Sequence, residues 1–213
     1  MKPLMTVLLC LCLAATFTPA RAAAKKNAAP AAKAGTEAAA PVDSLALLAK
    51  AVAKDSTNFD NLYQLGVMYL DKDQPHEAWY VLVRAHRLRP KDHRVDVNLG
   101  AALDAIGQAA NAQAYYHEAL ALAPEDSVAS CRLASSLYAQ SKYTDAVDIL
   151  RKVIREQPRA HCAYFVLGTV YADAGMYKDA IRVWRKVTEL APTSPEAVSA
   201  RESIEVLEKF VQQ

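Results

Sequence analysis

The side chains that could act as nucleophiles, bases or metal ligands are few and scattered along the chain. The five histidines are His76, His86, His93, His117 and His161, and none has the H-E-x-x-H or Cys/His spacing of a zinc site. His161 and Cys162 are adjacent, but a catalytic Cys–His pair needs a third, orienting group and a cleft. No Gly-rich phosphate loop is present. We therefore predict that the chain is not an enzyme and has no catalytic residue, cofactor or metal ion.

The N-terminal residues predict export. Lys2 is followed by a mostly apolar run, Leu4 to Phe17, which is too short to span a bilayer. Ala20-Arg21-Ala22 is a small-x-small cleavage site, so residues 1–22 have the pattern of a secretory signal peptide. The alternative, an uncleaved membrane anchor, lacks a stop-transfer flank. The short Ala-x-Ala site looks bacterial, and we expect a periplasmic protein with no integral membrane segment after cleavage near Ala22.

Residues 23–41 are rich in Ala, Pro and Lys and contain no bulky apolar residue. Such a segment buries too little surface to offset the entropy of ordering, so we predict a flexible linker. The alternative is a short Ala-driven helix between Pro30 and Pro41, which would be marginal in water at that length.

The balance of charge excludes one class of partner. Removal of residues 1–22 takes away Lys2 and Arg21, so the 25 basic residues become 23, equal to the 23 acidic ones. Binding to nucleic acid normally needs a basic surface that neutralises phosphates, and we predict none here. Two cysteines remain, Cys131 and Cys162, and in an oxidising compartment an even number permits a disulfide.

A 34-residue repeat organises the rest of the chain. The spacing holds for a proline, an alanine, a leucine and the small residue after that leucine. These four columns are Pro90, Pro124, Pro158 and Pro192; Ala78, Ala112, Ala146 and Ala180; Leu65, Leu99, Leu133 and Leu167; and Gly66, Gly100, Ala134 and Gly168. A proline inside a helix costs roughly 3 kcal/mol, so the proline column marks helix boundaries.

Each unit has the pattern of two short antiparallel helices. In the first unit Leu62, Leu65 and Tyr69 have helical spacing, and Pro75 suits the first turn of a second helix. Helices of about a dozen residues are marginal alone, so the pairs must stack to bury their apolar faces. The glycine and alanine column then marks places where two helices approach too closely for a large side chain.

This pattern resembles that of the tetratricopeptide repeat (TPR) family, W-x2-L-G-x2-Y, then A-x3-F, then P. The units are residues 59–92, 93–126, 127–160 and 161–194, with a leading helix over 42–56 and a capping helix over 195–213. The resemblance implies an all-α TPR domain over 42–213, a right-handed α-solenoid of stacked antiparallel helix pairs. Asp96 and Ser130 depart from the pattern where a large residue opens the unit, and we expect looser packing there.

In this family the first helix of each pair lines a concave groove that holds peptides or partner segments. One subfamily uses a carboxylate clamp, but Tyr63 and Val128 occupy its two lysine positions here. We expect an extended, apolar or mildly basic partner segment instead. Tyr63, Tyr138 and Phe165 are candidate anchors, and packing between first helices is an equal alternative for each. The resemblance implies that the groove includes Tyr63, Val67, Asp71, Arg94, Val97, Asp104, Cys131, Tyr138, Phe165 and Asp173.

Cys131 and Cys162 fall on adjacent first helices of the implied fold and are expected to point the same way. We hypothesise that they form a disulfide. The alternative is two free, half-buried thiols, since the separation of their Cα atoms decides whether a bond can form.

The resemblance implies a non-enzymatic protein–protein interaction scaffold or adaptor of the bacterial cell envelope. It would bind an extended peptide or partner segment in the concave groove. Two alternatives remain open: an accessory subunit of an exported enzyme, and a structural protein that associates with itself through the ends of the solenoid.

Overall fold

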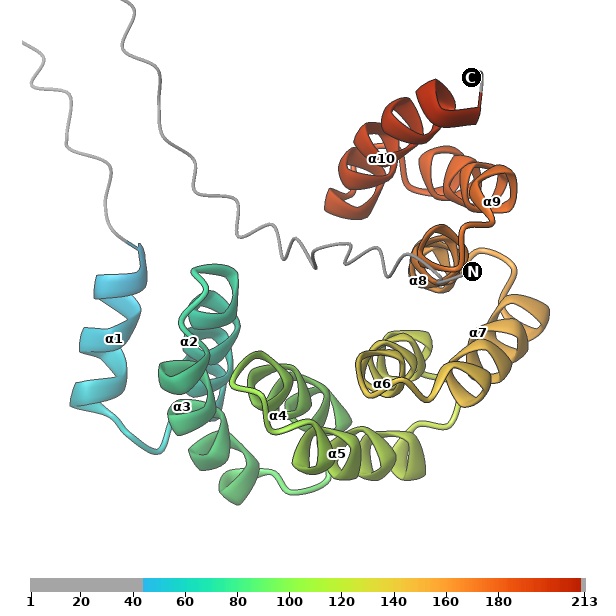
Figure 1. The fold of residues 1–213 in the computed structure, drawn as a ribbon. Helices are drawn as coiled ribbons and strands as arrows, with labels where there is room; N and C mark the ends of the chain where they lie inside the picture. The colour runs from blue at the N-terminus through green and yellow to red at the C-terminus, as the bar shows by residue number, and fades with distance from the viewer. Residues whose placement is uncertain (1–43, 212–213) are drawn as a thin grey trace, which may run out of the picture. The chain divides into compact units, whose positions relative to one another are not determined.

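The computed structural model describes residues 44–211. The predicted signal peptide and linker therefore lie outside the described residues. Ten helices occupy this range and no strand does, which confirms the all-α prediction (Figure 1). The helices are α1 (Ser44–Lys54), α2 (Phe59–Asp71), α3 (Pro75–Leu88), α4 (His93–Ala105), α5 (Ala109–Leu122), α6 (Ser127–Ala139), α7 (Tyr143–Glu156), α8 (His161–Asp173), α9 (Tyr177–Leu190) and α10 (Pro195–Val211).

The helices form stacked antiparallel pairs. α2 packs on α3, α4 on α5, α6 on α7 and α8 on α9, while α1 and α10 pack against the two ends of the row (Figure 1). Each first helix also contacts the first helix of the next pair, α2 with α4, α4 with α6 and α6 with α8. No helix within residues 44–211 is long and apolar enough to cross a membrane.

Three of the first helices start with a side-chain cap, whereas α8, the first helix of the fourth pair, starts after Ala160 without one. The side chains of Asn58, Asp92 and Asp126 accept hydrogen bonds from the first free N–H groups of α2, α4 and α6. The second helices have no such side-chain cap. They follow tight turns that pass through one left-handed residue, namely Asp73, Gly107, Ser141 or Gly175. The repeated turn explains why the second helix returns antiparallel in every pair.

The column of small residues lies where the two helices of a pair touch. A Cβ atom at Gly66 would lie 2.5 Å from Leu82 Cγ, and Gly100 and Gly168 are covered in the same way by Tyr116 and Trp184. All three covering side chains are buried. The glycines therefore make room for the largest side chains of the second helices.

Asp96 is packed more tightly than its sequence predicts. It is 1% exposed, and His86 Nδ1 donates a hydrogen bond of 2.8 Å to Asp96 Oδ1. The ring of Tyr115 lies edge-on to His86, with 6.0 Å between the ring centroids. The expectation of loose packing at this position is wrong, because a polar pair from α3 and α4 fills the place of a large apolar side chain.

Candidate partner-binding groove

The predicted groove residues differ in how much surface they expose. Val97 and Cys131 are buried, at 7% and 4% exposure, and so offer little surface to a partner. Tyr63, Val67, Asp104, Tyr138 and Phe165 are half-buried, and Asp71, Arg94 and Asp173 are exposed. The available surface is therefore carried by the aromatic and charged members.

One pair of positions recurs between neighbouring first helices, 31 residues apart in sequence. The pair is Tyr63 and Arg94 between α2 and α4, Val97 and Val128 between α4 and α6, Cys131 and Cys162 between α6 and α8, and Phe165 and Glu196 between α8 and α10. Two of these pairs are in contact, Tyr63 with Arg94 and Cys131 with Cys162, so equivalent positions carry different chemistry in different units.

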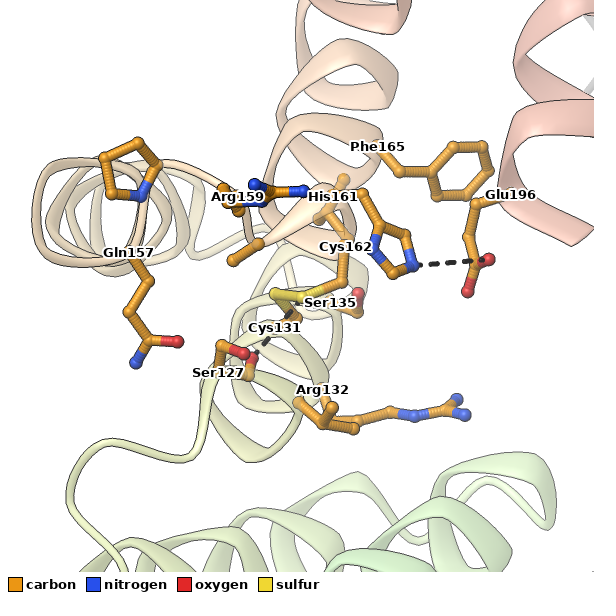
Figure 2. Close-up of a pocket in the computed structure, with 14 residues that line it drawn as sticks. Ser127, Cys131, Arg132, Ser135, Gln157, Arg159, His161, Cys162, Phe165 and Glu196 are labelled. Atoms are coloured by element: carbon orange, nitrogen blue, oxygen red, sulfur yellow. Dashed lines mark hydrogen bonds and ion pairs between the residues drawn. A yellow bond between two sulfur atoms is a disulfide. The ribbon is translucent and has the colours of Figure 1, made fainter. Parts of the chain in front are cut away.

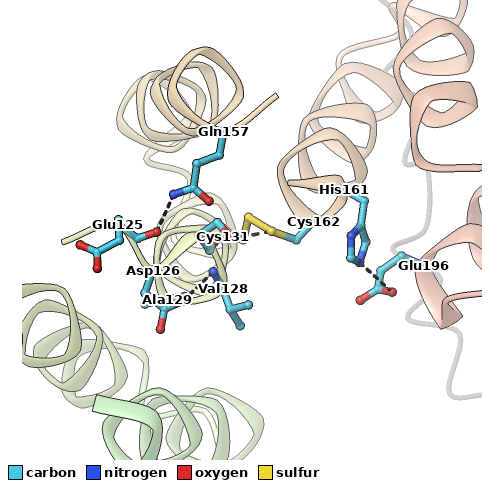
Figure 3. The surroundings of a disulfide bond; sticks show 10 residues. Glu125, Asp126, Val128, Ala129, Cys131, Gln157, His161, Cys162 and Glu196 are labelled. Atoms are coloured by element: carbon cyan, nitrogen blue, oxygen red, sulfur yellow. Dashed lines mark hydrogen bonds and ion pairs between the residues drawn. A yellow bond between two sulfur atoms is a disulfide. The ribbon is translucent and has the colours of Figure 1, made fainter. Parts of the chain in front are cut away.

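Cys131 and Cys162 are joined as a disulfide in the structure, with 6.1 Å between their Cα atoms (Figure 3). This Cα separation is in the usual range for a disulfide. The bond crosses the boundary between the third and fourth units, so it links α6 directly to α8.

The polar groups between α2 and α4 are satisfied within the chain. Arg94 Nε and Nη2 donate to Asp92 at 2.9 and 2.6 Å, and its guanidinium carbon lies 5.3 Å from the centroid of the Tyr63 ring. Asn98 Nδ2 donates to Tyr63 Oη at 3.2 Å. The hydrogen bond from Arg94 lowers the pKa of Asp92. Tyr63 is thus held between the first helices α2 and α4. This agrees with the alternative in which it packs between first helices and does not anchor a partner.

Asp104 is held by the next pair in a similar way. Tyr116 Oη donates to Asp104 Oδ2 at 2.9 Å, and Ser136 Oγ donates to Asp104 Oδ1 at 2.8 Å. Burial raises the pKa of Asp104 despite these two hydrogen bonds, and burial next to this carboxylate also raises the pKa of Tyr116. Both oxygens of Asp104 therefore serve the contact between α4, α5 and α6.

A cavity of about 680 Å³ lies between α6, α8, the turn at residues 157–160 and the start of α10 (Figure 2). The disulfide and the side chains of Val128, Phe165 and Val166 supply its apolar lining. Its charged lining consists of Arg132, Arg159, His161 and Glu196. This cavity is larger than the cavity of about 320 Å³ at the other end of α6 and α8.

The charges of this cavity are only partly paired. His161 Nε2 lies 3.8 Å from Glu196 Oε2. Arg132 extends from α6 on the side of the disulfide where this pair lies (Figure 2). Arg132 and Arg159 have no hydrogen-bond or ion-pair partner among residues 44–211, although Arg132 acts electrostatically on Asp104. Two guanidinium groups next to an apolar surface can bind a carboxylate that is joined to an apolar group.

A second cavity, of about 320 Å³, lies at the other end of the same helices. It is lined by Tyr138 of α6, Tyr143 of α7, and Val170, Asp173 and Ala174 at the end of α8. Tyr138 Oη donates a hydrogen bond to Asp173 Oδ2, and the two tyrosine rings are 5.3 Å apart with 57° between their planes. Burial, with this hydrogen bond, raises the pKa of Tyr138.

The sequence prediction named only some of these lining residues. Cys131, Tyr138, Phe165 and Asp173 were expected on the groove, whereas Arg159, His161 and Tyr143 were not assigned to it. Arg159 lies in the turn between units, His161 is the first residue of α8, and Tyr143 is the first residue of the second helix α7. In residues 44–211, no group of three or more His, Cys, Asp and Glu side chains is placed to hold a metal ion.

Comparison with known proteins places these units in a family. Residues 97–161 and 131–195 match the tetratricopeptide repeat family. The human tetratricopeptide repeat protein 7B is 30% identical over 128 residues, which is 60% of this chain. The chain spans only 15% of the length of that relative.

Solved structures share the fold at low identity. MamA is 23% identical with a TM-score of 0.56, and the match covers 68% of this chain and 85% of MamA. YrrB, a TPR protein with an unusual peptide-binding site, is 23% identical with a TM-score of 0.52, covering 74% of this chain and 81% of YrrB. TTC0263 of Thermus thermophilus is 16% identical with a TM-score of 0.66, covering 75% and 88%. The family match identifies residues 97–195 as tetratricopeptide repeats, and the stacked pairs and 34-residue columns continue the same pattern over residues 59–194.

Proposed function

We propose that this chain is a non-enzymatic scaffold of the bacterial cell envelope that binds an extended segment of a partner protein along α6 and α8. Tetratricopeptide repeat domains generally bind protein or peptide partners, and proteins built from them are typically not enzymes. The observation that carries the proposal is the 680 Å³ cavity, where an apolar surface lies beside two arginines that lack partners within residues 44–211.

The chemistry of this cavity defines the partner. Phe165, Val128 and the disulfide offer a surface for one apolar side chain, and burial of such a side chain supplies most of the affinity. Arg132 and Arg159 each offer a guanidinium group that can bind a carboxylate, either of a side chain or of a chain terminus. This differs from the apolar or mildly basic segment that the sequence predicts, because Asp104 is engaged within the fold whereas these arginines are not.

The binding site is tested with peptides selected from a random dodecapeptide library. Their affinities for the wild-type chain, for Phe165→Ala and for Tyr80→Ala are measured by fluorescence anisotropy. Tyr80 is the matched control, since it is 62% exposed on the second helix α3. Loss of a buried aromatic contact should reduce the binding free energy by about 1.4 kcal/mol or more. We therefore expect the Kd of Phe165→Ala to be at least tenfold higher than that of the wild-type chain.

The two variants also define the opposite result. Tyr80→Ala is expected to leave the Kd unchanged, and circular dichroism checks that both variants keep their helix content. Peptides that need Tyr80 and tolerate Phe165→Ala would place binding on the other face and contradict the proposal.

The location in the envelope is supported by the N-terminal pattern of residues 1–22. Expression of the full chain in a bacterium, followed by fractionation and N-terminal sequencing, tests it. We expect a periplasmic protein that starts at Ala23. A chain that keeps Met1 and stays in the cytosol would remove this part of the proposal.

A further inference from the structure

We propose that Tyr138, Tyr143 and Asp173 form a subsite for a basic side chain, lysine or arginine, of the partner segment. This inference rests on the proposed function, because the subsite lies on the same two helices as the larger cavity. The subsite would be a second point of contact for the partner segment and would fix its orientation along α6 and α8.

Two aromatic rings and a carboxylate meet in the 320 Å³ cavity. Tyr143 is 52% exposed, so a ligand can reach much of its ring, and the Tyr138 ring is tilted against it. The face of an aromatic ring carries partial negative charge and attracts cations, above all when a carboxylate lies beside it. An uncharged apolar ligand would gain nothing from Asp173.

Asp173 has capacity for a ligand. Only its Oδ2 atom is engaged, by the hydroxyl of Tyr138, and no lysine, arginine or histidine of residues 44–211 forms an ion pair with it. α6 ends at Ala139 and α8 ends at Asp173, so the carboxyl ends of both helices lie here. The partial negative charge of helix C-termini favours a cation at this place.

The other units provide an internal comparison. The three positions of the subsite have equivalents 34 and 68 residues earlier, between α4 and α6 and between α2 and α4. Those equivalents are Asp104, Ala109 and Ala139 in one case and Leu70, Pro75 and Ala105 in the other. Neither set contains an aromatic pair or a carboxylate at the last position, so the repeat itself does not require this cluster.

The two cavities place arginines that are unpaired within residues 44–211 at one end of the groove and a carboxylate at the other. Arg132 lies near the middle of α6 and Tyr138 near its end, while His161 and Asp173 mark the two ends of α8. At 1.5 Å per helical residue the cavities are separated by about 9–18 Å. An extended chain covers that distance with about three to five residues. The partner therefore places its acidic group at the starts of α6 and α8 and its basic group at their ends.

The test uses two small probes and does not need the partner. Nα-acetyl-lysine methylamide carries the cation, and Nα-acetyl-norleucine methylamide has a similar aliphatic side chain without charge. Each is titrated into the full chain with ¹³C-labelled tyrosine rings, and the ring signals of Tyr138 and Tyr143 are assigned with Tyr→Phe variants. We expect saturable shifts of these two signals with the lysine probe and little change with the norleucine probe.

Variants separate a charged subsite from a general apolar contact. Asp173→Asn keeps the size of the side chain and an acceptor for Tyr138, and should weaken the lysine probe at least fivefold. Tyr143→Ala should weaken it as well, while Arg132→Ala, in the other cavity, should not. Equal shifts with both probes, or full binding to Asp173→Asn with unchanged melting, would overturn the subsite.

The outcome is independent of the test of the proposed function. If the selected peptides need Phe165 but the lysine probe does not bind, the groove function stands and the subsite fails. If the lysine probe binds but no peptide is selected, the subsite stands and the groove function fails.

Discussion

The contact between α2 and α4 and the contact between α6 and α8 use the same pair of positions with different chemistry. The first holds Tyr63 and Arg94 by a cation–π contact at 5.3 Å, and the second holds Cys131 and Cys162 by a covalent bond. The backbone repeats, but the strength of the link between units does not. The comparison shows that one half of the solenoid is held by reversible contacts and the other half is tied.

The same two regions differ in what they leave for a partner. Around Tyr63 the charged side chain of Arg94 is paired with Asp92, and Asn98 binds the tyrosine hydroxyl. Around the disulfide, Arg132 and Arg159 are unpaired within residues 44–211. In this half the disulfide fixes the spacing of α6 and α8, and the two arginines beside it are available to a ligand. A pre-organised site of this kind loses less entropy when a ligand binds.

The largest expected effect comes from removal of the disulfide. The double variant Cys131→Val/Cys162→Val copies the pair Val97 and Val128 of the preceding units, so the packing stays apolar. The bond closes a loop with a sequence separation of 31, for which the chain-entropy relation gives a loss of about 3–4 kcal/mol. Unfolding in urea measures this change in free energy.

A reducing agent provides the control for that prediction. Dithiothreitol should lower the stability of the wild-type chain and leave the valine variant unchanged. A wild-type chain that ignores the reductant and whose two cysteines both react with iodoacetamide would show that the bond is absent in solution.

The next effect compares one glycine from each half. A Cβ atom at Gly168 would lie 2.5 Å from Trp184 Cδ1, and the indole is fixed by a hydrogen bond of 3.1 Å to the Phe165 carbonyl. Gly66 faces Leu82, whose side chain has no such hydrogen bond and can shift. We expect Gly168→Ala to cost about 1–3 kcal/mol and Gly66→Ala less. Thermal unfolding of both variants decides this, and equal or reversed losses would contradict it.

Asp96 tests the half of the molecule without the disulfide. Its Oδ2 atom is buried and has no hydrogen-bond partner, and the equivalent residue one unit earlier is Leu62. Asp96→Leu removes the cost of burying this oxygen, so we expect a gain of about 1–2 kcal/mol in the free energy of unfolding. A loss of stability in this variant would mean that the bond to His86 outweighs the unpaired oxygen.

The effect of Asp96 should depend on pH. Burial raises the pKa of this carboxyl in the folded state above that of the unfolded chain. Its contribution to stability is therefore present at pH below the unfolded pKa of about 3.9 and is lost as the pH rises through the folded pKa. The advantage of Asp96→Leu over the wild-type chain should be larger at pH 7 than at pH 4, as measured by urea unfolding at both values.

The smallest effect is expected at Tyr63 and Arg94. Arg94 is more than half exposed, so a cation–π contact there contributes about 0.5–1 kcal/mol. A double-mutant cycle with Tyr63→Leu and Arg94→Ala measures this coupling. A coupling as large as the effect of the disulfide would remove the distinction between a reversible and a tied half.

The repeat pattern was sufficient to predict the fold. The proline, alanine and glycine columns report local events, such as the end of a helix or a close approach of two helices, and these depend on a few neighbouring residues. The prediction of stacked antiparallel pairs is confirmed for this reason. The observed helices α2 and α3 end near Asp71 and Leu88, as Pro75 and Pro90 require.

The details of the groove depend on contacts that the pattern does not contain. The engagement of Asp104 by Tyr116 and Ser136 joins three helices, and Val97 is buried in a cluster with Ala119 and Ala129 from the next two helices. Arg159 and Tyr143 reach the cavities from a turn and from a second helix, outside the positions that the family pattern assigns to the groove. Asp96 misled the prediction, because a polar residue in an apolar column was expected to loosen the packing and instead pairs with His86.

The bond between α6 and α8 also has a mechanical consequence. When the two ends of the chain are pulled apart, the segment between Cys131 and Cys162 cannot be drawn out, because force passes through the sulfur atoms instead. At about 3.3–3.6 Å per extended residue, some 100 Å of contour length stays hidden until the bond is reduced. A scaffold that carries load between partners would keep its third and fourth units joined after the first two had been stretched.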